Sequence, residues 1–250
     1  AAGGEVATDS TPTCPVPQRR SVCDFPGMAR RRRRSGPKPI PVLPIREALL
    51  HDLLEHAVVF DIETTGFSHK DNEIIQLAGL RIHHGQVREL EVFDEYVRPT
   101  GLIPDEITQL TGIHDHHVRR ASEAYDVIRA FTNFVGDAVL VAHNGHSFDM
   151  RFMKAACNPK ASSGRPLRPV EYFDSLQYAR ACYGNVRGVP LRVENLCEML
   201  GVEAKGRRHS AIGDVNRLAH CLVRLADGIG RQLEAKAKVR SMLLPASSSI

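Results

Sequence analysis

Apolar and polar positions follow regular spacings from residue 56 onward. Residues 57–63 are apolar except for two carboxylates near the end, a pattern that predicts a buried strand. Two further apolar-rich segments, residues 73–83 and 87–97, are separated by His84-Gly85-Gln86, which predicts a hairpin. Together the three segments predict an antiparallel meander of three strands.

The chain after this meander alternates between helical and extended patterns. Short apolar runs at residues 138–142 and 170–173 predict two more strands. Helices are expected over residues 104–111, 122–135, 147–157, 174–180, 191–200 and 211–225. We expect Pro104 at the first position of its helix, Ser122 as a helix cap, and a loop over residues 158–169. This order of elements predicts an α/β domain with a mixed sheet.

Both ends of the chain differ in composition from the middle. Residues 1–46 hold eight of the 15 prolines and the arginine run 30–34, so they cannot bury enough apolar surface to fold alone. Residues 228–250 predict a basic helix followed by a Ser-rich tail. The expected organisation is therefore a disordered basic N-terminal segment (1–46), a folded domain (47–227) and a basic C-terminal tail (228–250).

The N-terminal segment carries nine Lys and Arg against three Asp and Glu. An Arg-rich segment poor in acids suits an organelle transit peptide, a nuclear import signal or a nucleic-acid-binding arm. We therefore expect an intracellular protein of the mitochondrion, the plastid or the nucleus rather than of the cytosol.

Overall composition excludes several classes of protein. Hydrophobic residues make up 42% and charged residues 25%, as in ordinary globular proteins, and no apolar run is long enough to cross a bilayer. The six cysteines form no C-x-x-C pair, which argues against a zinc site and a compact disulfide framework and favours buried or free thiols.

Charge is unevenly distributed along the chain. Residues 47–160 carry a formal net charge of −8, and residues 161–250 carry a net charge of +6. An acidic pocket can meet a polyanion only if cations neutralise it, whereas basic flanks attract phosphates directly. The simpler interpretation is a solvated surface with uneven charge.

Asp61 and Glu63 stand at the end of the first predicted strand. Side chains two residues apart on a strand point to the same face, so the two carboxylates project together. Such neighbours repel each other unless a cation lies between them or one takes a proton. The alternative is an exposed strand end followed by a turn.

Two further clusters contain carboxylates. In the segment His-Asn-Gly-His-Ser-Phe-Asp, residues 143–149, Asp149 falls in the first turn of a helix, where the helix dipole alone would favour it. In the segment 209–214, His209 and Asp214 can face one pocket only if His209 lies on the loop before the helix, and Gly206 supplies the freedom for such a loop. Neither cluster is decisive by itself.

In combination the three motifs are more specific. D-x-E-x-T-G at 61–66, H-N-G-x-x-F-D at 143–149 and H-x-A-x-G-D at 209–214 resemble, in this order, the motifs of the DEDDh (DnaQ-like) 3′-to-5′ exonucleases. The resemblance covers roughly residues 55–226. It implies a ribonuclease-H-like fold, with a mixed five-stranded sheet flanked by helices.

Two branches of this family compete. Segments within residues 58–113, together with Phe173-Asp174-Ser175-Leu176, look like bacterial proofreading exonuclease domains. The spacing of Asn144 and Asp149, and the segment 209–215, are more similar to three-prime repair exonucleases and to plant exonucleases that degrade organelle DNA. We favour the second branch.

The resemblance also implies a mechanism. Carboxylate oxygens without thiolates suit two Mg²⁺ ions, for which Mn²⁺ can substitute. The implied metal ligands are Asp61, Glu63, Asp149 and Asp214. His209 would take the proton of the attacking water, for which an imidazole is suited near neutral pH.

Thr64, Phe67 and Leu110 correspond to family positions around the 3′-terminal nucleotide, although core packing is the alternative for Phe67 and Leu110. The expected partners are nucleic acid 3′ ends, with DNA favoured and no membrane, and either a homodimer or a polymerase.

The expected reaction is release of nucleoside monophosphates from DNA, from single strands or frayed 3′ ends. An RNA-trimming exonuclease and a catalytically silent nucleic-acid-binding or polymerase-docking module are the alternatives. Structural roles or solvated turns are expected for the remaining histidines of the motifs and hairpins, namely His83, His84, His114, His116, His117 and His143.

Overall fold

The computed structural model describes residues 46–157, 167–184, 190–203, 210–228 and 236–246. In these residues a mixed sheet of eight strands runs in the order β1-β8-β7-β6-β2-β3-β4-β5. The strands are β1 (Arg46–Leu49), β2 (His56–Thr64), β3 (Ile74–His83), β4 (Gln86–Arg98), β5 (Ser122–Glu123), β6 (Val139–Ala142), β7 (Leu167–Asp174) and β8 (Lys236–Pro245). The helices are α1 (Leu50–Leu53), α2 (Asp105–Thr111), α3 (Asp115–Val118), α4 (Ala124–Val135), α5 (Asp149–Ala156), α6 (Ser175–Tyr183), α7 (Val193–Leu200) and α8 (Ala211–Asp227).

The predicted meander is confirmed. β2, β3 and β4 pair antiparallel, and a two-residue turn joins β3 to β4. His84 and Gly85 have φ values of 51° and 67° in this turn, the left-handed geometry that matches the twist of a tight hairpin. β6 pairs parallel with β2, and β7 parallel with β6, so the sheet is mixed as expected.

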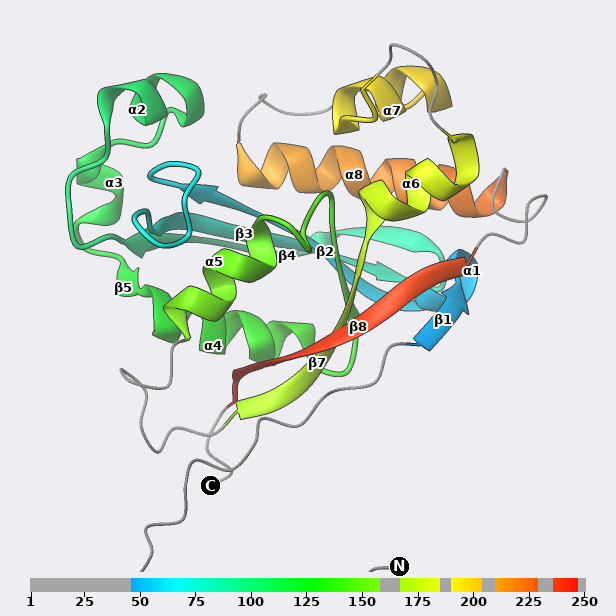
Figure 1. Cartoon of the computed structure of the whole chain (residues 1–250), viewed down its shortest axis with the longest axis horizontal. Helices are drawn as coiled ribbons and strands as arrows, with labels where there is room; N and C mark the ends of the chain where they lie inside the picture. Colours follow the sequence, from blue (N-terminus) through cyan, green and yellow to red (C-terminus); the bar gives the residue numbers. More distant parts are fainter. Residues whose placement is uncertain (1–45, 158–166, 185–189, 204–209, 229–235, 247–250) are drawn as a thin grey trace, which may run out of the picture. The chain divides into compact units, whose positions relative to one another are not determined.

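Helices cover both faces of the sheet. In Figure 1, α8 with α7 beside it lies on one side of the central strands, and α4 and α5 lie on the other. Val215 and Leu218 of α8 pack with Val59 of β2 in one buried cluster. Phe60 of β2 packs with Phe131 of α4 in the other. Alternate residues of β2 therefore serve two cores, which is why this strand is apolar along most of its length.

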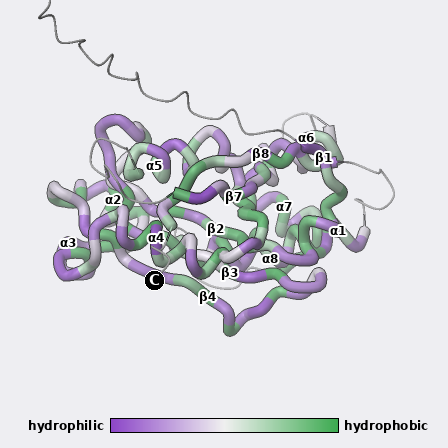
Figure 2. The backbone as a smooth tube through the Cα atoms, turned by 90° about the horizontal axis from the view of Figure 1, so that it is seen from below, coloured by the Kyte–Doolittle hydropathy of each residue, from purple (hydrophilic) through white to green (hydrophobic). Residues whose placement is uncertain are grey.

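β4 behaves differently, because it lies near the edge of the sheet and most of its residues are exposed. Its sequence alternates, and the tube in Figure 2 changes repeatedly between hydrophilic and hydrophobic colours along it. Its apolar side chains are not all turned to the domain, because Leu90 is 99% exposed and Val92 is 39% exposed.

Two helix starts differ from the expectation. Ser122 does not cap a helix, because it pairs with Val97 in the short strand β5, and α4 begins two residues later. Pro104 is the residue before α2 and not its first helical residue. In both cases the helix begins one or two residues later than expected, because helix propensity alone places the first residue of a helix only approximately.

The C-terminal segment 228–250 was expected as a basic helix and tail, and the helix prediction is wrong. Residues 236–245 form β8, which pairs antiparallel with β7 and with β1. Buried Ala237 and Val239 alternate with exposed Lys236 and Lys238, which is the period of a strand and not of a helix. With β1, β5 and β8 the sheet has eight strands rather than five.

Some sequence predictions fall outside the described residues, including most of the N-terminal segment 1–46 and residues 158–166 of the expected loop. Residues 167–169 of that loop belong to β7. Cys157, Cys182, Cys197 and Cys221 are free thiols, as expected. Among the described helices, none is long and apolar enough to cross a membrane.

Candidate metal centre

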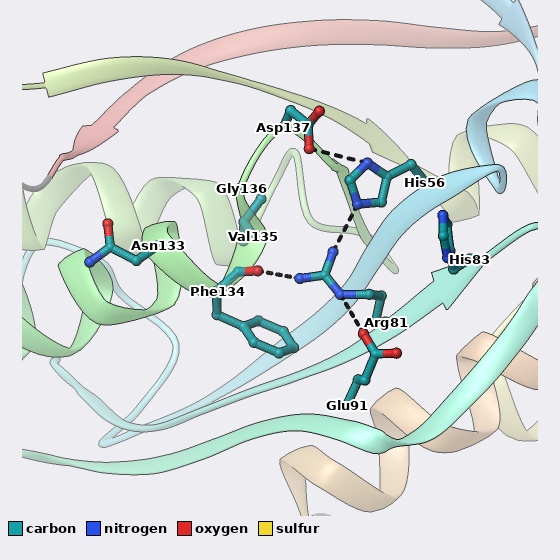
Figure 3. Close-up of a pocket in the computed structure, with 9 residues that line it drawn as sticks. All are labelled: His56, Arg81, His83, Glu91, Asn133, Phe134, Val135, Gly136 and Asp137. Atoms are coloured by element: carbon teal, nitrogen blue, oxygen red, sulfur yellow. Dashed lines mark hydrogen bonds and ion pairs between the residues drawn. The ribbon is translucent and has the colours of Figure 1, made fainter.

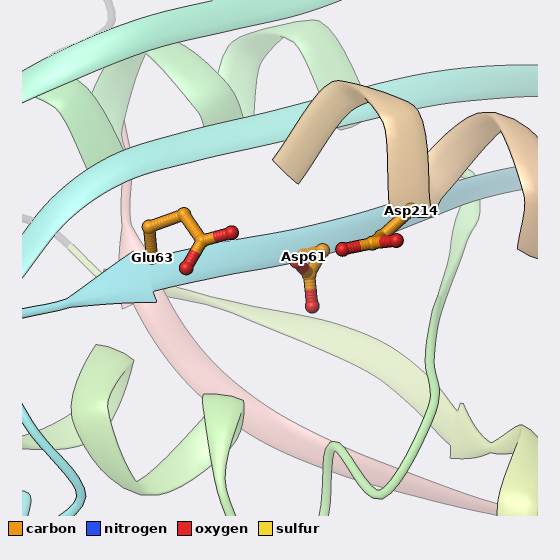
Figure 4. Close-up of side chains that lie close together, drawn as sticks. All are labelled: Asp61, Glu63 and Asp214. Carbon is orange, nitrogen blue, oxygen red and sulfur yellow. The ribbon is translucent and has the colours of Figure 1, made fainter. Parts of the chain in front are cut away.

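Three carboxylates converge at the end of β2. Asp61 and Glu63 come from β2 and Asp214 from the first turn of α8, and one oxygen of each lies within 4.8 Å of the others. Figure 4 shows the three side chains facing a common space between the strand and the helix. The predicted shared face of Asp61 and Glu63 is confirmed.

The sequence of β2 explains this placement. Ala57 and Val59 belong to the core beneath α8, and Asp61 and Glu63 continue the same row of side chains beyond it. α8 packs across this face through apolar residues, so its N-terminal turn, with Asp214, lies over the end of the row. The apolar contacts that hold α8 against β2 therefore also bring Asp214 close to Asp61 and Glu63.

Burial, and after it mutual repulsion, disfavours the charged forms of these carboxylates. Burial, followed by the charges of Asp214 and Asp149, raises the pKa of Glu63 to about 7. Burial also raises the pKa of Asp61 well above its usual range, with further contributions from Asp149, Glu63 and Asp214. A cluster with such pKa values holds protons or binds cations near neutral pH.

Asp149 is the fourth acidic residue of this region. It is the first residue of α5 and is 2% exposed, and burial raises its pKa to about 7. Its Oδ1 atom is buried and has no hydrogen-bond partner among the described residues. A buried carboxylate oxygen without a partner, beside three converging carboxylates, fits a site for divalent cations with oxygen ligands.

A buried carboxylate on the neighbouring strand holds the loop that leads to Asp149. Asp174 Oδ1 accepts hydrogen bonds from the backbone N–H of Asn144 at 3.0 Å and of Leu176 at 3.0 Å, and Oδ2 accepts one from His146 N–H at 3.2 Å. Asn144 has φ of 64°, so the loop turns sharply after β6. Asp174 thus joins the start of α6 to the loop that positions α5.

Asp174 was noted in the sequence only as part of a family resemblance, without a role. The signal was available, because an Asp between an apolar run and a helix is typical of a helix N-cap.

Arg217 was missed entirely. It lies one turn after Asp214 on α8, donates a hydrogen bond to Asp214 Oδ1, and has a side chain that is only 2% exposed. An Arg three residues after an Asp in a predicted helix indicates such a pair.

The candidate substrate residues have different environments. Thr64 is buried and its Oγ1 donates to the carbonyl of Gly66 at 2.6 Å. Phe67 is 83% exposed and Leu110 is 42% exposed, so the core-packing alternative is wrong for both. Two exposed apolar side chains thus lie in the β2–β3 loop and on α2.

The candidate base, His209, and Gly206 lie outside the described residues. Of the other histidines, His143 bonds to Ser175 Oγ at 3.0 Å and to the carbonyl of Leu191 at 2.7 Å, in keeping with its expected structural role. Among the described residues, Asp61, Glu63 and Asp214 form the group of side chains that could together hold a metal ion.

A hollow of about 400 Å³ lies at the opposite end of β2. Figure 3 shows Arg81 at its centre, donating to the carbonyl of Phe134 and paired with Glu91 at 2.9 Å, while His56 pairs with Asp137 at 3.2 Å. The charges of this hollow are paired internally, and it is separate from the carboxylates at the other end of the strand.

Sequence comparison finds relatives among bacterial DNA polymerases. The chain is 34% identical over 185 residues to the PolC-type DNA polymerase III of Bacillus subtilis, covering 73% of this chain and 12% of the relative. The PolC-type enzyme of Halalkalibacterium halodurans is 36% identical over 168 residues, covering 67% and 11%. The chain thus spans about a tenth of the length of these relatives.

Solved structures show the same fold. The nuclease domain of 3′hExo, described as a DEDDh family member bound to rAMP, has a TM-score of 0.56 at 22% identity, covering 70% of this chain and 94% of that one. Escherichia coli Exonuclease I with a dT13 oligonucleotide has a TM-score of 0.57 at 20% identity, covering 72% and 42%. The exonuclease family RNase_T matches residues 58–222, a span that begins in β2 and ends in α8. The chain, with its acidic motifs in DEDDh order, therefore belongs to the RNase_T exonuclease family.

Proposed function

We propose that this chain is a metal-dependent 3′-to-5′ exonuclease that hydrolyses DNA ends to nucleoside monophosphates. The observation that carries the proposal is the convergence of Asp61, Glu63 and Asp214 within 4.8 Å, at the end of a buried strand. Like charges repel, and Arg217 is paired with Asp214 alone of the three, so burial and repulsion raise the pKa values of Asp61 and Glu63. Metal binding offsets that repulsion.

The residues present suit two Mg²⁺ ions, with Mn²⁺ as a substitute, because all the donors are hard oxygens. Such ions stabilise the attacking and leaving oxygens in a displacement at phosphorus. Asp61, Glu63, Asp149 and Asp214 would hold them, with Asp61 central, since it interacts with the charges of the other three. Asp149 contributes a buried oxygen that otherwise lacks a partner.

His209 is the proposed general base for the attacking water. It directly precedes Ser210, the residue before α8, and Asp214 lies in the first turn of that helix. A neutral imidazole accepts a proton near neutral pH, which matches the task. Exposed Phe67 and Leu110 are suited to hold the terminal nucleotide by apolar contact with its base, a mode of binding that tolerates any sequence.

DNA is favoured because the relatives found by sequence are DNA polymerases, in which an exonuclease domain would remove misincorporated nucleotides. The same similarity supports proofreading beside a polymerase as the second candidate function. RNA trimming stays the alternative substrate class, since one structure of this fold recognises the 3′ end of a histone mRNA stem-loop. A catalytically silent module is disfavoured, because the five DEDDh motif residues are all present in the sequence.

One assay tests the proposal. Purified protein with Mg²⁺ is incubated with single-stranded DNA, duplex DNA and RNA of the same sequence, labelled at the 5′ end to reveal stepwise shortening. We expect DNA ladders that shorten from the 3′ end, and no reaction with excess chelator. An Asp61→Asn variant serves as the inactive control. Stable DNA and RNA with both Mg²⁺ and Mn²⁺, or degradation that survives chelation, would refute the proposal.

A further inference from the structure

Arg217 is a fully buried cation beside a cluster of acidic residues. It is 1% exposed, and its guanidinium donates to Asp214 Oδ1 from the next turn of α8. The side chain of Asp214 is 23% exposed, against 2% for Arg217. The carboxylate is therefore partly open to solvent, while the guanidinium that it accepts from is buried.

Removing an Arg side chain from water is costly, and proteins retain buried Arg where its donors are satisfied. The guanidinium is planar and presents its donors in a fixed geometry, and its bond to Asp214 Oδ1 restricts the orientation of that carboxylate. A Lys at this position would supply the charge without that fixed geometry. The identity of the residue thus matters for orientation as well as for charge.

We infer that Arg217 is a positioning residue, which fixes the carboxylate of Asp214 in the orientation required by a divalent metal ion of strict geometry. The inference rests on the proposed metal-dependent function. Partners that orient a ligating group commonly change metal affinity or activity by about 10- to 100-fold when they are removed. Asp214 comes from α8 and not from β2, so its orientation is set separately from those of Asp61 and Glu63.

Charge and orientation predict opposite effects here. Arg217 is a cation, so its removal would on charge alone strengthen the binding of any divalent metal ion. Loss of orientation would weaken binding, and would weaken Mg²⁺ more than Ca²⁺, because Mg²⁺ demands nearly ideal octahedral geometry and Ca²⁺ tolerates irregular sites. The ratio of the two affinities therefore separates the roles, since a pure charge effect acts on both ions alike.

The test measures the dissociation constants of Mg²⁺ and Ca²⁺ by calorimetry on wild-type protein, Arg217→Met and Arg217→Lys. Arg224→Met is the matched control, because Arg224 lies on the same helix and is exposed. We expect Arg217→Met to bind Mg²⁺ about 10- to 100-fold more weakly while Ca²⁺ binding changes much less. Arg217→Lys should bind Mg²⁺ with intermediate affinity, and Arg224→Met should match wild type.

Circular dichroism of each variant confirms folding, and Arg217→Lys carries the test if Arg217→Met does not fold. Three results would overturn the inference. The folded variant could bind Mg²⁺ with unchanged affinity, it could bind both ions more tightly, or its affinities for the two ions could change by the same factor. Failure of the wild-type protein to bind Mg²⁺ would instead contradict the proposed function. The two failures are therefore distinguishable.

Discussion

Asp174 and Asn144 are joined by a hydrogen bond of 3.0 Å from the Asn144 backbone amide to the Asp174 carboxylate, across the adjacent parallel strands β7 and β6. The same carboxylate also caps α6 through Leu176 N–H. Since Asn144 begins the turn that leads to Asp149, one buried side chain ties the second acidic motif to the sheet. This relationship gives the first prediction.

Replacing Asp174 with Ala would leave three backbone amides without their acceptor. Because hydrogen bonds to charged groups contribute more than neutral ones, we expect the free energy of unfolding to fall by about 3 kcal/mol or more. Urea denaturation measures this change. Asp227→Ala, at the exposed end of α8, is the control and should stay within about 0.5 kcal/mol of wild type. Equal stability of the two variants would contradict the anchoring role.

The stability of the metal-free protein should depend on pH through Glu63. Its pKa is about 7 in the folded protein and has the ordinary value near 4.3 in the unfolded chain. The protonated acid is thus favoured by folding, and this contribution is present at low pH and is lost as the pH rises through 7.

The Glu63→Gln variant has no ionisable group at this position. Its free energy of unfolding relative to wild type should therefore increase from about pH 5 to about pH 8, by at most about 3 kcal/mol. Thermal or urea denaturation in the presence of chelator measures the difference. A difference that is constant over this range, or that shrinks, would contradict the assignment. Saturating Mg²⁺ should restore stability to the wild-type protein and not to the variant.

Replacing Asp61 or Asp214 should abolish turnover without unfolding the domain. Each substitution removes a proposed metal ligand and also relieves repulsion among the remaining carboxylates. We expect Asp61→Asn to lose activity by at least about 10³-fold, while its melting temperature in chelator equals or exceeds that of wild type. Substantial activity in the folded variant would show that the metal is held elsewhere.

His209→Ala should lower kcat by roughly 10²- to 10⁴-fold, with much smaller effects on the affinities for metal and DNA. The rate of the wild-type enzyme should decrease as the pH falls through the pKa of this imidazole, because the protonated ring cannot accept a proton. That decrease should be absent from the residual activity of the variant. Near-normal kcat in the variant would assign the base to another group.

Residues 1–46, with their net positive charge, are proposed to determine location and to be dispensable for chemistry. A fluorescent protein fused to this segment should accumulate in an organelle or in the nucleus, and diffuse cytosolic fluorescence would contradict both. The truncated enzyme should keep its kcat. An unchanged KM at low salt would exclude a role as a nucleic-acid-binding arm, because phosphate contacts are strongest there.

The sequence predicted an element correctly where its local pattern of apolar residues matches the way the element packs in the folded protein. β2 was predictable because its apolar run serves two cores, and the shared face of Asp61 and Glu63 followed from the period of a strand. β8 was not, because its lysines suggested a solvated helix, while burial of Ala237 and Val239 depends on pairing with β1 and β7.

Within the site, motif order identified the carboxylates, but pairing between side chains was harder to foresee. Arg217 was missed because sequence reasoning treats an Arg as exposed by default, and only the packing of α8 shows that it is buried. Asp174 was noticed without its role, since two of its three hydrogen bonds cross from one strand to the next.

The pairing of β1 with β8 has an architectural consequence. Arg46 lies opposite Val239, so the first and last strands of the described sheet are hydrogen-bonded neighbours, on the side of β2 away from β3 and β4. Removing β8 would therefore leave β1 without its partner and would expose the hydrogen-bonding edge of β7, on which another chain could pair.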